Sequence, residues 1–169
     1  VGGRERQIAH LAKEPRFDLV RGDICDSSSV TPLVAKSDVV LNNAASKLVV
    51  SAMKPMIDVQ TNVIGTFNIL LAAKEKPGIR LIHASTGSVL GSSPDPMPET
   101  HEKNPTTIYG ISKLAAENYC GFFAREYGVQ VSVLRYFHVF GPRQDYDGEA
   151  GVVSIFLSRL MDGDRPVVF

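Results

Sequence analysis

Tyr109 and Lys113 are the two residues whose types and spacing most directly suggest chemistry. They lie four apart in the run Tyr-Gly-Ile-Ser-Lys, within a segment of helical period, so both side chains would project from one face of a helix. A lysine ammonium beside a phenol favours the phenolate and lowers a pKa that starts at about 10. Such a tyrosine can act as a base near neutral pH. The same spacing also arises by chance in many helices, so the pair alone leaves a structural alternative open.

Polar or small residues follow three of the strands that the sequence predicts. They are Asp23 after the run at 17–21, Ala44, Ala45 and Lys47 after the run at 39–41, and Ser85, Thr86 and Ser88 after the run at 80–83. Ligands of open α/β sheets bind at the carboxyl ends of the strands. At that edge, Thr86 can hydrogen-bond a substrate and Lys47 can meet a phosphate as a point charge. Ser and Thr are also ordinary turn formers, which keeps a structural role open for the hydroxyls.

The elements that would position these residues follow from the hydrophobic pattern. Short apolar runs alternate with longer segments of helical period, which predicts an α/β fold with a Rossmann-like doubly wound parallel sheet. Strands are expected at 17–21, 39–41, 80–83, 129–134 and 166–169, and helices at 4–14, 28–36, 56–75, 107–126 and 152–162. Asp26 is placed to cap one helix, and Gly78 and Gly128 to end two others. The proline-rich stretch 92–107 is expected to be an exposed, functional loop.

The composition, 44% apolar and 21% charged over 169 residues, is typical of a soluble globular domain. Eighteen Lys and Arg balance eighteen Asp and Glu, which argues against nucleic acid and membrane surfaces as partners. No window reaches the roughly 18 uninterrupted apolar residues of a membrane span, and no signal pattern opens the chain, so we predict a cytoplasmic protein. Cys25 and Cys120 are expected to be reduced and buried. No cysteine or histidine pair has metal-ligand spacing, so no metal is expected.

Several motifs, in a shared order and spacing, resemble one enzyme family. They are Gly22-Asp23-Ile24, Asn43-Ala44-Ala45, the run 61–66, Ala84-Ser85-Thr86 with Val89-Leu90-Gly91, Tyr109 with Lys113, and the run 135–144. Together they resemble the extended short-chain dehydrogenase/reductases, within them the NAD-dependent epimerases and dehydratases of nucleotide sugars, and most closely the UDP-sugar 4-epimerases. The resemblance covers nearly the whole chain.

The resemblance implies a role for each matching residue, with NAD as cofactor and NADP not excluded. Tyr109 would be the acid/base that takes the proton from the sugar hydroxyl. Lys113 would hold the nicotinamide ribose and lower the tyrosine pKa, and Thr86 would hydrogen-bond the reacting oxygen. The remaining cofactor residues implied are Asp23 and Ile24 at the adenine, Ala44, Ala45 and Lys47 at the phosphates and ribose, Asn62 as support, and Tyr136 near the nicotinamide.

The sequence also departs from the family pattern. The glycine-rich turn G-x-x-G-x-x-G and the following strand with its acid are not found, since Gly2-Gly3 precede a different helix. We therefore expect 1–169 to be a fragment, a partial NAD(P)-binding domain with most of the substrate domain missing. His138 stands where the family usually has an Asn near the substrate phosphates, and a neutral histidine can still donate one hydrogen bond there.

The resulting hypothesis is a nucleotide-sugar 4-epimerase that oxidises and re-reduces a ring carbon. A dehydratase or dehydrogenase of the same family is the first alternative, but dehydratases typically carry an Asp-Glu pair after the active-site threonine, where this chain has Gly87 and Ser88. A non-catalytic cofactor sensor or scaffold is the second alternative. A homodimer is expected by analogy with the family.

Without the glycine-rich turn, the pyrophosphate of a dinucleotide lacks its main cradle of backbone amides. We therefore expect the 169 residues alone to bind NAD weakly or not at all. Calorimetric titration of the isolated chain with NAD checks this, and micromolar or tighter binding would contradict it.

Overall fold

The computed structural model describes residues 5–144 and 151–167. They form two compact units. Residues 20–136 make up the first unit, and residues 5–19 with the described residues from 137 onward make up the second. All but one of the predicted site residues belong to the first unit, and His138 belongs to the second.

A parallel three-stranded sheet is the centre of the first unit. Its strands β1 (Val39–Asn42), β2 (Arg80–Thr86) and β3 (Gln130–Tyr136) lie in the order β1-β2-β3. Val39 is paired with Arg80, and Arg80 with Gln130, so the three carboxyl ends meet at one edge. The parallel sheet with its flanking helices confirms the Rossmann-like α/β fold predicted from the alternation of strands and helices.

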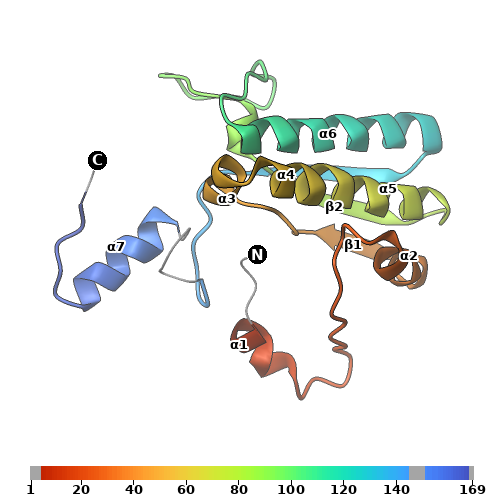
Figure 1. The fold of residues 1–169 in the computed structure, drawn as a ribbon, viewed down its shortest axis with the longest axis horizontal. Helices are drawn as coiled ribbons and strands as arrows, with labels where there is room; N and C mark the ends of the chain where they lie inside the picture. The colour runs from red at the N-terminus through yellow and green to blue at the C-terminus, as the bar shows by residue number, and fades with distance from the viewer. Residues whose placement is uncertain (1–4, 145–150, 168–169) are drawn as a thin grey trace. The chain divides into compact units, whose positions relative to one another are not determined.

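The helices of the first unit precede and follow these strands. They are α2 (Ser27–Lys36), α3 (Leu48–Met53), α4 (Pro55–Asp58), the π-helical segment η2 (Val59–Gly65), α5 (Thr66–Lys74), the short 3-10 helix η3 (Gly87–Val89) and α6 (Ile108–Tyr127). Helices α5 and α6 run side by side, as Figure 1 shows, and α6 also packs on β2 and β3. The second unit contains α1 (Glu5–Ile8), the 3-10 turn η1 (Ala9–Leu11) and α7 (Val152–Met161).

Local capping explains where two of the long helices begin and end. The carboxylate of Asp26 accepts a hydrogen bond from the Ser28 amide at the start of α2, and the Thr107 hydroxyl accepts one from the Gly110 amide at the start of α6. Gly128 ends α6 with φ +67°, a left-handed conformation that favours glycine. The caps at Asp26 and Gly128 confirm two boundaries that the sequence predicted.

The apolar core lies between the sheet and helices α2, α5 and α6. Leu70, Leu81 and Cys120 are fully buried there, and Phe123 is 2% exposed. Cys25 was also expected to be buried, but it is only half-buried, with its thiol 3.3 Å from the Gln60 carbonyl oxygen. Both cysteines are free, as predicted.

Several predicted elements differ from the observed ones. The run 17–21 forms no strand, and a strand requires a neighbour with which to exchange backbone hydrogen bonds. The helix expected at 4–14 is the shorter pair α1 and η1. Of the strand expected at 166–169, residues 166 and 167 carry no strand, and the last two lie outside the described residues. Helix α3 and the turn η3 were not predicted.

The helix predicted at 56–75 is a continuous helical run, Pro55–Lys74, whose middle is π-helical. By length and composition alone the run could cross a membrane, and 44% of its apolar window is buried within the structure. A core helix passes the same test, so this is weak evidence for a membrane span.

The first turn of α6 packs tightly against η3 at Gly110. A Cβ atom at this glycine would lie 2.6 Å from the Ser88 carbonyl oxygen and 2.9 Å from the Pro105 Cβ. Real Cβ atoms do not approach backbone that closely, so the absence of a side chain allows the start of α6 to meet the turn that follows β2.

We predict that Gly110→Ala destabilises the protein by about 1–3 kcal/mol, because the new methyl group must push backbone apart. Gly121→Ala is the matched control in the same helix. The nearest atom to its Cβ would be a guanidinium nitrogen of Arg125, at 3.4 Å. That control should stabilise by up to about 1 kcal/mol through helix propensity. Urea unfolding of both variants is the measurement, and equal midpoints would contradict the tight packing.

Candidate active site

The carboxyl ends of β1 and β2 and the first turns of α6 form the candidate site. Thr86 is the last residue of β2 and is 9% exposed, and its hydroxyl accepts a hydrogen bond from the Ser88 amide at 3.2 Å. Tyr109 lies in the first turn of α6, half-buried, next to the glycine that packs on Ser88. The structure therefore brings the segment that carries Tyr109 against the turn that carries Thr86.

Lys113, one helical turn after Tyr109, is 1% exposed. Its Nζ lies 3.3 Å from Nε2 of His83, and among the described residues that ring is its only hydrogen-bond partner. Burial lowers the Lys113 pKa from its usual value to about 8, although Cys120, Asp58 and Glu117 act in the opposite direction. The ammonium is thus mostly charged at neutral pH. Because an ammonium has three donors, two of them remain for oxygens of a ligand.

Asn62, in the π-helical segment, connects three parts of the site. Its Oδ1 accepts from the Ser46 amide at 2.9 Å, and its Nδ2 lies 3.1 Å from the Ser46 carbonyl oxygen and 3.1 Å from Oγ of Ser112. The Ser112 hydroxyl in turn donates to the Tyr109 carbonyl oxygen at 3.0 Å. Asn62 therefore joins the segment after β1 to the first turn of α6. π-Helical turns are frequent at functional sites, and this one points a fully buried amide into the site.

Asp58 is a fully buried carboxylate at the end of α4. Its Oδ1 accepts from Nδ2 of Asn62 at 2.7 Å and from the hydroxyl of Ser51. Its Oδ2 has no hydrogen-bond partner among the described residues. Asp58 raises the Lys113 pKa electrostatically, so it helps to keep the ammonium charged.

The residues expected around the cofactor lie at the same edge of the sheet or beside it. Ala44 and Ala45 are half-buried after β1, and Lys47 is exposed at the start of α3. Asp23 is exposed and accepts from the Cys25 amide at 2.9 Å. Ile24 is half-buried, and its carbonyl oxygen accepts from Nδ2 of Asn68 in α5 at 3.0 Å.

Two further predicted residues end or follow β3. Tyr136, its last residue, is paired in register with Thr86 and is 44% exposed. His138 is exposed in the second unit, so the site of the first unit is described without it. The described residues hold no cluster of three or more side chains able to bind a metal ion.

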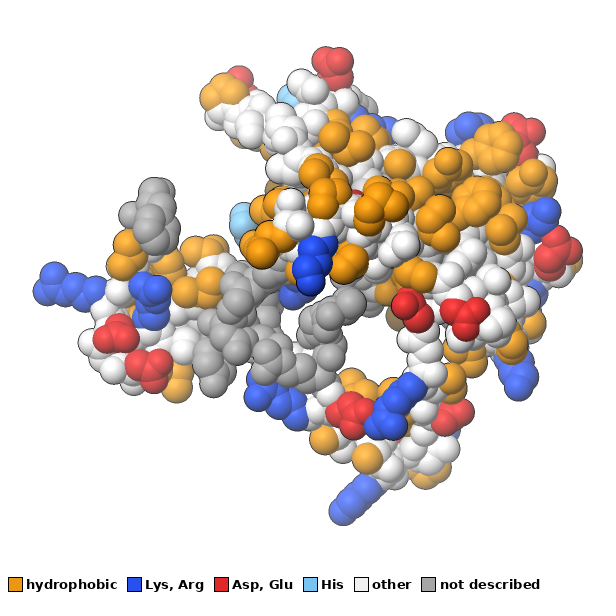
Figure 2. All heavy atoms as spheres, in the orientation of Figure 1, with side chains coloured by type: hydrophobic (Ala, Val, Ile, Leu, Met, Phe, Trp, Pro, Cys, Tyr) orange, Lys and Arg blue, Asp and Glu red, His pale blue; other side chains and the backbone are white. Residues whose placement is uncertain are grey.

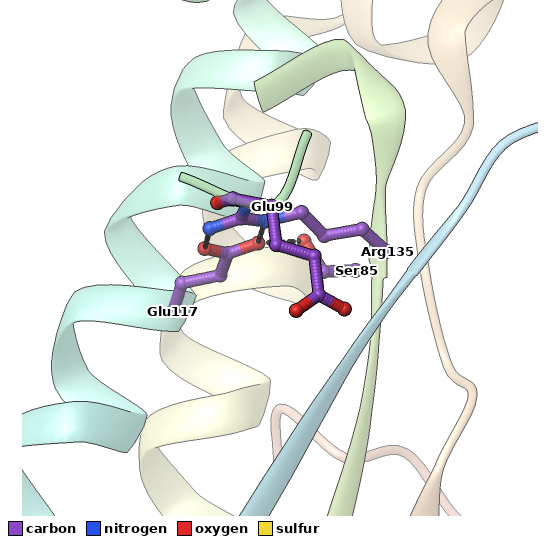
Figure 3. A network of polar contacts seen from close by, with 4 residues as sticks. All are labelled: Ser85, Glu99, Glu117 and Arg135. Carbon is purple, nitrogen blue, oxygen red and sulfur yellow. Dashed lines mark hydrogen bonds and ion pairs between the residues drawn. The ribbon is translucent and has the colours of Figure 1, made fainter. Parts of the chain in front are cut away.

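The sequence did not predict the ion pair between Arg135 and Glu117, which lies near the site. Figure 3 shows the Arg135 guanidinium lying along the Glu117 carboxylate, with Nε at 3.0 Å and Nη2 at 2.9 Å from its oxygens. The Ser85 hydroxyl donates to the same carboxylate at 2.6 Å. Arg135 also donates to the carbonyl oxygen of Glu99 at 3.1 Å, so the ion pair ties the proline-rich loop to α6 and β3. Residues 18 positions apart give no local signal for this pairing.

His83 was also missed as a site residue. It lies in the strand expected at 80–83, and in the structure it is fully buried and touches Lys113. The alternation of β2 offered a signal, because Leu81, His83 and Ser85 share one face of the strand, and all three are buried. A histidine on a buried face must find hydrogen-bond partners.

The parallel sheet with its flanking helices is the Rossmann-like fold of the family that the sequence resembles. The model of the NAD dependent epimerase/dehydratase family matches residues 2–169, and the chain belongs to this family.

Individual relatives support the assignment. The chain is 35% identical over 159 residues to a putative UDP-glucose 4-epimerase of Methanocaldococcus jannaschii, which covers 92% of this chain and 52% of that protein. It is 34% identical over 172 residues to a UDP-glucose 4-epimerase of Mycolicibacterium smegmatis, and the match covers 99% of this chain and 55% of that protein. It is 35% identical over 171 residues to a dTDP-glucose 4,6-dehydratase of an Actinoplanes species, and the match covers 98% of this chain and 52% of that protein. The chain thus spans about half the length of the curated relatives it matches.

Solved structures agree with these sequences. The UDP-glucose 4-epimerase of Thermotoga maritima with UDP-glucose superposes with a TM-score of 0.82 at 36% identity, covering 89% of this chain and 50% of that one. The UDP-glucose 4-epimerase of Thermus thermophilus, solved with NAD, gives a TM-score of 0.80 at 33% identity, covering 96% and 59%.

The Glu117–Arg135 pair generates a pH prediction. Burial raises the Glu117 pKa, but hydrogen bonds from Arg135 and Ser85 outweigh it, and the pKa lies below the usual carboxyl value. The stabilisation is therefore present above about pH 4.3, the unfolded carboxyl pKa, and disappears as the pH falls through the lower pKa of the folded state.

We expect Glu117→Gln to cost about 1–3 kcal/mol at pH 7, because Arg135 then loses its charged partner, and to reduce the acid sensitivity of folding. Glu126→Gln, exposed on the same helix, is the control and should change little. Urea unfolding between pH 3 and pH 7 measures both. A Glu117→Gln protein as stable as the wild type at pH 7 would contradict the assignment.

Proposed function

We propose that the protein is an NAD-dependent nucleotide-sugar 4-epimerase in which Tyr109 is the acid/base. The observation that supports this most directly is the start of α6, where Tyr109 precedes the glycine that packs on the turn after Thr86 and the buried Lys113 follows one helical turn later. The relatives named UDP-glucose 4-epimerases match nearly the whole chain, which favours this activity for the complete protein.

The donor set of the site fits a dinucleotide. Lys113 keeps two ammonium hydrogens without an acceptor among the described residues, and ribose hydroxyls are suitable acceptors for them. The small side chains of Ala44 and Ala45 leave the backbone at the end of β1 open to close approach. When bound, NAD supplies the hydride acceptor and donor for the sugar carbon. Solved relatives contain NAD, and NADP remains the alternative cofactor.

The chain's own residues then move a single proton. Tyr109 takes the proton of the sugar hydroxyl at its Oη and later returns it. Lys113 stabilises the phenolate by its charge, and Thr86 hydrogen-bonds the reacting oxygen. In this proposal the cofactor also meets Asp23, Ile24, Lys47, Asn62 and Tyr136, and the substrate meets His138.

A dehydratase or dehydrogenase of the same family is the alternative activity, favoured by the dTDP-glucose 4,6-dehydratase that matches at similar identity. Eliminating water requires positioned acid and base groups. The residues that follow Thr86 are Gly87 and Ser88, which carry no carboxylate, so we favour the epimerase. A non-catalytic sensor is the weakest alternative, because it has no use for a buried ammonium beside a tyrosine. We propose that the protein acts in the cytoplasm.

We further propose a homodimer formed through α5 and α6. Figure 2 shows hydrophobic side chains gathered on the face where these helices lie. Leu71, Tyr119, Phe122 and Tyr127 are 39% to 50% exposed there, and they line a groove of about 720 Å³. An apolar patch of this kind typically marks an interface. A monomeric complete protein in sedimentation experiments would contradict the dimer.

We predict that Tyr109→Phe in the complete protein lowers kcat on UDP-glucose by a factor of about 10² to 10⁴, the usual contribution of general acid/base catalysis. Tyr119→Phe removes a hydroxyl from an exposed tyrosine of the same helix and should leave kcat unchanged. Product analysis by NMR distinguishes UDP-galactose from a dehydrated sugar. Retention of most activity by Tyr109→Phe would remove this tyrosine from the proposed role.

A further inference from the structure

His83 lies fully buried in β2, between an amide and an ammonium that come from two other elements. Its Nδ1 is 3.2 Å from Nδ2 of Asn42, the last residue of β1, and its Nε2 is 3.3 Å from Nζ of Lys113 in α6. Asn42 is itself 3% exposed and lies 3.2 Å from the hydroxyl of Thr66. Asn42, His83 and Lys113 therefore form a buried chain of polar contacts that ends at the ammonium.

The charge of Lys113 dictates the tautomer of this ring. A charged ammonium can only donate, so Nε2 must accept and the ring proton must sit on Nδ1. That proton then needs an acceptor, and the side chain facing it is the amide of Asn42. Asn42 Oδ1 is buried and has no hydrogen-bond partner within residues 5–144 and 151–167. A half-turn of the amide turns Oδ1 toward the ring proton, while Nδ2 gives up its contacts with the ring and with the Thr66 hydroxyl.

Neutral Lys113 fits the opposite arrangement. The ring proton then sits on Nε2 and is donated to the lone pair of Nζ, while Nδ1 accepts from Nδ2 of Asn42. In this orientation the same amide group also donates to the Thr66 hydroxyl oxygen, whose own hydrogen goes to the Asn62 carbonyl oxygen. Each charge state of Lys113 thus favours one tautomer of His83, Nδ1–H beside the ammonium and Nε2–H beside the neutral amine.

We propose that His83 is a positioning residue for Lys113, and that the Asn42–His83 pair holds the ammonium at the site and switches tautomer when Lys113 loses its proton. The proposal rests on the proposed function in one respect, the assumption that the charge of Lys113 supports catalysis by Tyr109. The switch itself needs no catalytic role for Tyr109 or Lys113, because it depends only on the buried side chains of Asn42, His83 and Lys113.

The surrounding charges support a neutral ring as the acceptor. Burial lowers the pKa of His83 to about 3, and the charge of Lys113 adds to this, while Glu117 opposes it. The ring therefore stays neutral at any pH at which the enzyme would work. The other titratable groups that face Lys113 are Asp58 from α4 and Glu117 and Cys120 from α6, with Tyr109 one turn away. Among the described residues, the carboxylates of Asp58 and Glu117 and the Cys120 thiol make no hydrogen bond to Nζ, and the direct contact comes from His83.

The first experiment reads the ring directly and does not depend on activity. In the complete protein labelled with ¹⁵N-histidine, we expect the His83 ring signals to change from the Nδ1–H to the Nε2–H tautomer with a midpoint near pH 8, the pKa of Lys113. Lys113→Met should abolish the transition, and His83→Gln identifies the signals by their loss. A ring that keeps one tautomer from pH 6 to pH 10 in the wild type would overturn the proposal.

The second experiment tests the consequence for catalysis. Removing the acceptor lowers the Lys113 pKa further, so Tyr109 loses its neighbouring charge, and the rising limb of the kcat profile should move up by about 1 pH unit or more in His83→Leu. His83→Gln offers an amide oxygen to Nζ and should restore part of the shift. Leu81→Val, on the same buried face of β2, is the control, and should lower the unfolding temperature without moving the limb.

The outcomes separate this proposal from the proposed function. A folded His83→Leu protein with an unmoved limb would overturn the role of His83, even if Tyr109 proves essential. Should the complete protein have no activity on nucleotide sugars, the tautomer transition still decides whether His83 responds to Lys113. If His83→Leu does not fold, His83→Gln and the wild-type titration carry the test.

Discussion

Lys113 places an ammonium inside the protein with 1% of its surface exposed, and moving a charge out of water is expensive unless nearby groups compensate. Here the compensation is divided. One neutral acceptor, His83, touches Nζ, and the carboxylates of Asp58 and Glu117 act through space. The ammonium is thereby kept charged near neutral pH but is left short of hydrogen-bond acceptors. A buried cation in this state is an effective donor to an incoming oxygen and an effective stabiliser of a neighbouring phenolate.

Holding that charge requires the surrounding elements to keep fixed positions. Asn62 is bonded both to the segment after β1 and to Ser112 beside Lys113, and Gly110 lets α6 approach η3. One helical turn after Lys113 in α6, Glu117 is bound by Arg135 of β3 and Ser85 of β2. Most of these partners are buried, so water cannot replace a lost bond, and loss of one partner leaves an unpaired polar group. The site is thus rigid on its protein side.

The sequence allowed prediction of features whose physical cause is local. The Tyr109–Lys113 pair follows from helical spacing, the α2 boundary from the Asp26 cap, and the end of α6 from Gly128. Features that depend on distant partners were not predictable in the same way. The run 17–21 looks like a strand by composition, yet strand formation depends on a neighbour to pair with.

The contacts of the site illustrate the same limit. The π-helical turn that carries Asn62 has the apolar period of an ordinary helix. Its sequence therefore does not indicate that the turn contains one residue more than an α-helical turn. Glu117 and Arg135 pair across 18 positions, and His83 meets Lys113 across 30. Such pairings are decided by which helix packs on which strand. Only the general rule that buried polar groups need partners would have singled out His83, once its face of β2 was known to be inward.

The near-equal identity to epimerases and dehydratases, 34–35% over almost the whole chain, has a physical interpretation in this arrangement. In the proposed function, a buried ammonium, a tyrosine and a strand-end hydroxyl would handle a proton at one oxygen, a task that does not depend on what happens elsewhere on the substrate. Differences in outcome must then come from a few groups facing the substrate. Gly87 and Ser88, directly after Thr86, are at such a place, and neither can donate or accept a proton as a carboxylate does at neutral pH. Within the proposed function, the lack of a carboxylate in this short turn is thus the feature of the chain that favours epimerisation over elimination.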